Sequence, residues 1–132
     1  MDIKPIRTKA DYRAALKAVE SLMGAKARTP DGDRLDVLVT LIEGYERLHF
    51  PMDLPDAVEA IKFRMEQQGL TPKDLEPLIG RSNRVYEVLN RRRALTLAMI
   101  QRLHAGLGIP AESLLRQTVP GRSVSEPSAL SA

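Results

Sequence analysis

The sequence contains no cysteine and no tryptophan, and only 4% of its 132 residues are aromatic. Without cysteine there can be no disulfide framework and no thiolate metal site, which suits a reducing compartment. No apolar run approaches the roughly 20 residues that cross a membrane, and the polar N-terminus is unlike a signal peptide. We therefore expect a cytoplasmic protein with no membrane partner. An apolar fraction of 43% is enough for a modest core, so we expect one domain, or a small domain with an appendage.

Patterns typical of catalysis or metal binding are equally scarce. The two histidines, His49 and His104, are 55 positions apart and lack neighbouring ligands at metal-site spacing. There is no Gly-rich phosphate loop, nucleophile elbow or carboxylate pair in a recognisable context. The five methionines are interpreted as core fillers. We therefore expect recognition rather than enzyme activity, with no catalytic residue, metal or cofactor.

Helical periodicity predicts an all-α fold. In the N-terminal region, residues 1–50, a first helix is expected from Thr8 to about Gly24 and a second from about Asp33 to His49, with a loop over residues 26–33. Prolines mark a junction at residues 51–55. Five helices are expected within residues 56–117, beginning at Asp56 and including two short ones hinged at Gly80. The tail, residues 118–132, is expected to be disordered.

The basic excess lies entirely in the second half of the chain. Residues 1–54 hold nine basic and nine acidic side chains, whereas residues 55–132 hold eleven basic and eight acidic ones. Within residues 81–93, the only acidic residue is Glu87, and the five arginines are Arg81, Arg84, Arg91, Arg92 and Arg93. A solvated face is the ordinary interpretation of such a cluster. Beside the helix pair hinged at Gly80, phosphate binding is favoured instead.

The two short helices of residues 70–93 predict a helix-turn-helix, whose second helix enters the major groove of DNA. At about 100° per residue, the second helix has an apolar face and a polar face. The apolar face carries Val85, Val88 and Leu89, and the polar face carries Asn83, Glu87 and Asn90. Asparagine and arginine can pair bidentately with adenine and guanine. As an alternative, Asn83 and Asn90 only cap the ends of the helix.

The candidate DNA-binding residues combine this polar face, its arginine flanks and the start of the preceding helix. They are Thr71, Lys73, Arg81, Ser82, Asn83, Arg84, Tyr86, Glu87, Asn90, Arg91, Arg92 and Arg93. One recognition helix reads too few base pairs for useful specificity, so we expect a homodimer on a palindromic site.

Several segments carry a family resemblance. They include Gly69-Leu70-Thr71, Leu78-Ile79-Gly80, Val88-Leu89-Asn90 and Leu107-Gly108-Ile109. Their order over residues 56–115 is similar to the lambda-repressor-like, Xre-type DNA-binding domain. Three further segments resemble, more narrowly, the HigA branch of toxin-antitoxin proteins: Asp56-Ala57-Val58-Glu59-Ala60-Ile61, Arg84-Val85-Tyr86-Glu87 and Leu41-Ile42-Glu43-Gly44-Tyr45-Glu46.

The resemblance implies an antitoxin that neutralises a small, basic, RelE-like mRNA-cleaving toxin encoded beside it. It also implies that the antitoxin represses its own operon as a dimer on operator DNA. Three positions depart from the family pattern. Pro72 stands where glutamine is common, the step from Gly80 to Val85 is one residue shorter than in the commonest repressors, and Arg91 stands where glycine often follows Asn90. The alternative function is a stand-alone Xre-type repressor with an N-terminal dimerisation region.

The second helix has an apolar stripe that two helices of this size are not expected to bury between themselves. Such a surface usually marks an interface. Its residues, assigned to binding of the toxin, are Leu35, Leu38, Val39, Leu41, Ile42 and Tyr45. The alternative is that the DNA-binding domain or the second copy of a dimer covers them.

Overall fold

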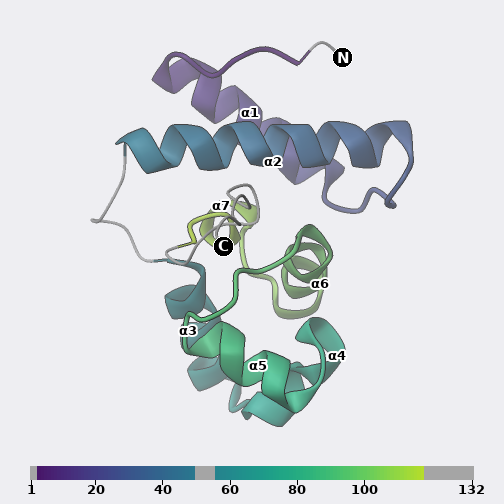
Figure 1. Ribbon diagram of the computed structural model, residues 1–132, viewed down its shortest axis with the longest axis vertical. Coiled ribbons are helices and arrows are strands. Elements are labelled where there is room, and N and C mark those ends of the chain that lie inside the picture. The colour runs from purple at the N-terminus through teal and green to yellow at the C-terminus, as the bar shows by residue number, and fades with distance from the viewer. Residues whose placement is uncertain (1–2, 50–55, 118–132) are drawn as a thin grey trace, which may run out of the picture. The chain divides into compact units, whose positions relative to one another are not determined.

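The computed structural model describes residues 3–49 and 56–117, and the described residues form helices, turns and loops with no strand. The chain divides into two compact units, Met1–Leu54 and Pro55–Ala132 (Figure 1). The division falls inside the predicted junction. The junction itself and the predicted disordered tail lie outside the described residues. The all-α prediction is confirmed for the described part of the chain.

The first unit is a pair of helices, α1 (Lys9–Leu22) and α2 (Pro30–His49). At the start of α1, the Thr8 hydroxyl accepts a hydrogen bond from the Asp11 amide, and the Asp11 carboxylate accepts one from the Thr8 amide. This reciprocal cap satisfies donors that have no partner within the helix. Hydrogen bonds from the amides of Arg7 and then Thr8 hold the pKa of Asp11 below its ordinary value. The predicted start of the first helix is therefore confirmed.

Aromatic side chains join the two helices of this unit. The Tyr12 ring of α1 stacks on the Tyr45 ring of α2, with centroids 5.0 Å apart, and Tyr45 stacks in turn on His49. The Tyr12 hydroxyl donates a hydrogen bond to the Glu46 carboxylate. Buried Ala15 and Val19 complete the inner face of α1. Because a buried tyrosine needs a partner for its hydroxyl, the Glu46 carboxylate has a structural role here.

The second helix begins at Pro30, three residues before the predicted start at Asp33. The Thr29 hydroxyl accepts a hydrogen bond from the Gly32 amide at 3.0 Å, and the Thr29 carbonyl accepts one from the Asp33 amide at 2.8 Å. Threonine is a good cap, and proline at the first helical position needs no amide donor. The prediction of a loop through residues 30–33 was wrong because Pro30 and Gly32 were interpreted as loop residues, whereas they form the first turn of α2.

Gly32 lies where the loop before α2 passes closest to the helix. A Cβ atom at this position would lie 2.1 Å from the carbonyl oxygen of Lys26, which is a backbone atom. Elsewhere in a helix, alanine is more favourable than glycine by about 1 kcal/mol. Here, we expect Gly32→Ala to lower the free energy of unfolding by about 1 to 3 kcal/mol, because the loop must move away. Urea unfolding followed by circular dichroism measures this change.

Gly24→Ala is the matched control, since nothing lies within 4 Å of a Cβ atom there. Its free energy of unfolding should stay within about 0.5 kcal/mol of the parent. A Gly32→Ala variant as stable as the control would show that the loop accommodates a side chain at no cost.

The second unit contains five helical segments within residues 56–117. They are α3 (Ala57–Gln68), a 3-10 turn η1 (Pro72–Leu75) continuing into α4 (Glu76–Ile79), α5 (Ser82–Leu89), α6 (Leu97–Leu107) and α7 (Ala111–Leu114). Asp56 caps α3 and Thr96 caps α6, while Gly69 and Gly108 end these helices in the left-handed conformation. These caps follow the predicted positions. The side chains that fill the core include Ile61, Leu75, Ile79, Val85, Ile100, Leu103, Ile109 and Leu114, each at most 2% exposed.

The two ends of this unit are joined by polar contacts. The Ala57 amide donates a hydrogen bond to the Arg116 carbonyl at 2.7 Å. The Gln117 side chain bonds both polar groups of the Leu95 backbone, accepting from the amide at 2.6 Å and donating to the carbonyl at 3.3 Å. Backbone groups beside a core need such partners. The loop before α6 is therefore tied to the last described residue. None of the helices in the described ranges has the length and apolar character needed to span a bilayer.

Candidate nucleic-acid interface

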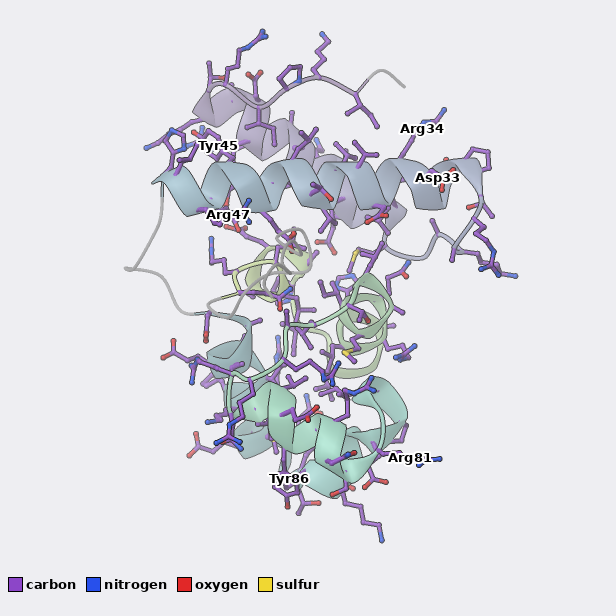
Figure 2. All side chains as sticks on the ribbon, in the orientation of Figure 1. Asp33, Arg34, Tyr45, Arg47, Arg81 and Tyr86 are labelled. Atoms are coloured by element: carbon purple, nitrogen blue, oxygen red, sulfur yellow. The ribbon has the colours of Figure 1, made fainter. Side chains whose placement is uncertain are left out.

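A sharp turn joins α4 to the helix α5. Gly80 makes this turn with φ of 140°, in a region that side chains rarely adopt. The helix starts two residues later, after Arg81, and no side chain caps its first turn. Val85, Val88 and Leu89 are buried, as the helical wheel predicts. The remaining faces of α5 carry the polar side chains outward, and Figure 2 shows Arg81 and Tyr86 directed away from the helices.

Three of the five clustered arginines have no carboxylate partner among residues 3–49 and 56–117. Arg81 and Arg92 are exposed, and Arg84 is half-buried with its aliphatic stem beside Gly80. Exposed Asn83 stands between Arg81 and Arg84 in the first turn of α5. It lies inside the helix, so it is not the residue that caps it. The guanidinium groups of Arg81 and Arg84 and the side-chain amide of Asn83 therefore occur together at the start of α5.

Arg91 forms an ion pair with Asp56 inside the second unit. Its Nε and Nη2 atoms donate to the two carboxylate oxygens of Asp56, at 2.7 and 3.0 Å. The Asp56 carboxylate also caps α3 by accepting from the Glu59 amide at 3.0 Å. Hydrogen bonding to Asp56 raises the pKa of Arg91 above its ordinary value. Because Asp56 is only 4% exposed, this ion pair replaces much of the water that its charge has lost.

The backbone of Arg91 is as unusual as its side chain. Its φ is 61°, in the left-handed region where glycine is the usual residue. The ion pair with Asp56 offsets the cost of this conformation. We therefore infer that Arg91, predicted to bind DNA phosphate, acts in the fold as a link between α5 and α3.

Arg93 and Glu87 form a second pair, with 2.7 Å between Nε and the carboxylate. Both side chains are partly exposed, at 45% and 40%, so solvent screens the interaction. Glu87 was predicted on the DNA-facing side of the helix, where a bare carboxylate would repel phosphate. The Arg93 guanidinium neutralises it. Asn90 is exposed and ends α5, and its backbone amide donates a hydrogen bond to the Tyr86 carbonyl at 2.9 Å.

Thr71 and Lys73, the predicted contacts of the preceding helix, lie at the start of η1. Both side chains are exposed. The Thr71 hydroxyl donates to the Asp74 carboxylate at 3.2 Å, and the Thr71 amide donates to the same carboxylate at 2.8 Å. Thr71 therefore stands at the N-cap position of η1, as its sequence context predicts, and the Asp74 carboxylate is the partner of its amide and hydroxyl. Lys73 has no ion pair with any residue in the described part of the chain.

The apolar stripe assigned to the toxin is largely buried in this structure, and its binding of a partner stays a prediction. Five of its six residues are at most 8% exposed, namely Leu35, Leu38, Val39, Ile42 and Tyr45, and Leu41 is half-buried. The apolar side chains of α2 that reach solvent are instead Val37, 45% exposed, and Leu48, 80% exposed. The side of α2 away from its buried residues therefore presents exposed apolar side chains.

One residue of this region was missed from the sequence as a site residue. Asp56 was predicted only as the start of a helix, although it also binds Arg91, 35 positions away. The signal available for Asp56 was its carboxylate, since a buried acidic cap commonly has a cationic partner.

The chain matches no model of a known protein family, and no curated protein matches it. The geometry and the residue patterns therefore carry the functional conclusion.

Proposed function

We propose that the chain is a sequence-specific DNA-binding repressor, with α4 and α5 as a helix-turn-helix in a lambda-repressor-like domain. The observation that carries this proposal is a set of three arginines around the outward face of α5 that have no carboxylate partner in the described part of the chain: Arg81, Arg84 and Arg92. A surface that keeps these cations unneutralised suits a polyanion. The start of α5, with no side-chain cap, adds backbone donors of the kind that bind phosphate.

The residues divide into three roles in this proposal. Arg81, Arg92 and Lys73 bind phosphates, which position the protein without reading sequence. Asn83 and Arg84, in the first turn of α5, reach base edges in the major groove. Arg91 and Arg93 keep Asp56 and Glu87 neutralised. Exposed Tyr86 lies beside this face and can contact sugar or the thymine methyl group.

From the resemblance to HigA proteins, we further propose that the chain is an antitoxin. It would bind a small basic toxin of the RelE-like kind and repress the shared operon as a dimer. The proposal includes no catalytic activity. Purification from cells that also carry the neighbouring reading frame tests it, because an antitoxin should co-elute with a small protein. A chain that elutes without one, yet binds an operator, would be a stand-alone repressor.

The DNA-binding proposal is tested by selection from random duplex DNA. We expect a palindromic sequence with half-sites about one helical turn, 34 Å, apart. Affinity for it should fall steeply with salt, because each phosphate contact releases condensed counterions. Titrations at several salt concentrations by fluorescence anisotropy measure both effects. Failure to enrich any sequence, together with affinity that does not change with salt, would contradict the proposal.

A further inference from the structure

We propose that a second copy of this chain docks on α2, so that two α2 helices pair antiparallel across a two-fold axis. The surface is a stripe of four residues, called here the α2 seam: Val37, Leu41, Gly44 and Leu48. These residues are spaced by four, three and four positions, so they follow one line along the helix. The inference goes beyond the proposed function by naming the dimer surface.

The seam consists of apolar side chains that the chain itself leaves uncovered. Val37 is 45% exposed and Leu48 is 80% exposed, and Leu41 between them is half-buried. The buried residues of α2, such as Leu35 and Ile42, lie on the other side of the helix. A seven-residue repeat of apolar positions on one helix edge is the pattern that pairs helices.

The glycine at position 44 is a second observation that favours a helix packed on the seam. Glycine inside a helix weakens it, so it usually has a packing reason. Among residues 3–49 and 56–117 no such reason is found, because a Cβ atom there would meet only the Arg47 Nη2 atom, at 3.9 Å. A glycine is useful where another helix approaches closely. Gly44 therefore points to a helix from outside the chain.

The charged side chains beside the seam indicate that this outside helix is α2 of a second copy of the chain. The same flank of the seam carries Asp33 near one end of the helix and Arg47 near the other, and Figure 2 shows both at the ends of α2. In an antiparallel pair centred near residue 39, Asp33 faces Arg47 of the second copy, and Arg47 faces Asp33. A parallel pair would instead place this flank of the two helices on opposite sides of the seam, so neither charge would meet its complement.

The same register fills the centre of the pair. Val37 faces Leu41 of the second copy, and the exchange is repeated by symmetry. Leu48 faces Pro30, and Gly44 leaves room for the aliphatic stem of Arg34. Each α2 helix has 20 residues centred near position 39, so the two helices overlap along their full length. The surface is thus complementary to itself, as a two-fold interface requires.

The test is sedimentation velocity of the full chain without DNA, over a series of concentrations. We expect a dimer. Val37→Lys should raise the dissociation constant about a hundredfold, because it places a charge at the centre of the interface twice. Phe63→Lys is the matched control, since it removes an exposed apolar side chain from α3 and should leave the dimer unchanged. Circular dichroism should show the same helix content for both variants.

Charge exchange tests the register. Asp33→Arg places arginines opposite Arg47 at both ends and should weaken the dimer about tenfold. Adding Arg47→Asp reverses both pairs and should restore the parent affinity. A monomeric parent chain, a dimer unaffected by Val37→Lys, or a double variant as weak as Asp33→Arg alone would each overturn the proposal. Because no DNA is present, these outcomes are independent of the DNA-binding proposal.

Discussion

Arg91→Ala is expected to lower the free energy of unfolding of the second unit by about 2 to 3 kcal/mol. The substitution removes two hydrogen bonds, of 2.7 and 3.0 Å, from the Asp56 carboxylate. That carboxylate is 4% exposed, so it remains buried with its charge less well compensated. The Arg91 side chain is 38% exposed, and solvent screening keeps the loss below that of a fully buried pair. Urea unfolding followed by circular dichroism gives the value.

Arg91→Gly is the control that separates the side chain from the backbone. Glycine loses the same ion pair but adopts a φ of 61° without strain. We expect it to be about 1 kcal/mol less destabilising than alanine. Equal losses for the two variants would mean that the backbone of Arg91 is not strained. A loss below about 0.5 kcal/mol for both would remove Arg91 from the group of stabilising residues.

The features best predicted from the sequence depend on residues that are close together along the chain. Thr8, Thr96 and Gly108 mark helix ends through hydrogen bonds or backbone conformations that span at most four residues. The helical wheel of α5 needed only the helical period, and its three buried residues were predicted correctly. The start of α2 could also have been found, because Thr29 followed by Pro30 is a capping pattern.

Contacts between distant residues could not be predicted. The partner of Arg91 is 35 positions away, and the partner of Leu95 is 22 positions away. Composition showed five arginines and one glutamate in residues 81–93, but not which arginines were already paired. The apolar stripe of α2 is a related case. Periodicity identifies an apolar face, but the burial of Leu35 or Ile42 depends on what packs there.

If the chain binds DNA as proposed, these pairings decide which arginines remain for phosphate contacts, and they set the largest expected effect on binding. The triple variant of Arg81, Arg84 and Arg92 to alanine should lose affinity for the operator about a hundredfold or more at physiological salt. If Arg81 and Arg92 each bind one phosphate, a dimer loses four contacts. The slope of log affinity against log salt should then fall by about 3.6, at about 0.9 for each phosphate. Fluorescence anisotropy across salt concentrations measures both quantities.

Single variants then separate the roles of these arginines. Arg84→Ala should cost about 1 to 3 kcal/mol on the operator and little on random DNA, because a base contact is lost. Arg92→Ala should weaken both by the same factor, since phosphates carry no sequence. Arg13→Ala, on an exposed position of α1, is the control and should change neither. Arg93→Ala tests the division between paired and unpaired arginines. If it lowers the salt slope as much as Arg92→Ala does, the ion pair between Arg93 and Glu87 must open on DNA. Pairing in the free protein would then not predict which arginines bind phosphate.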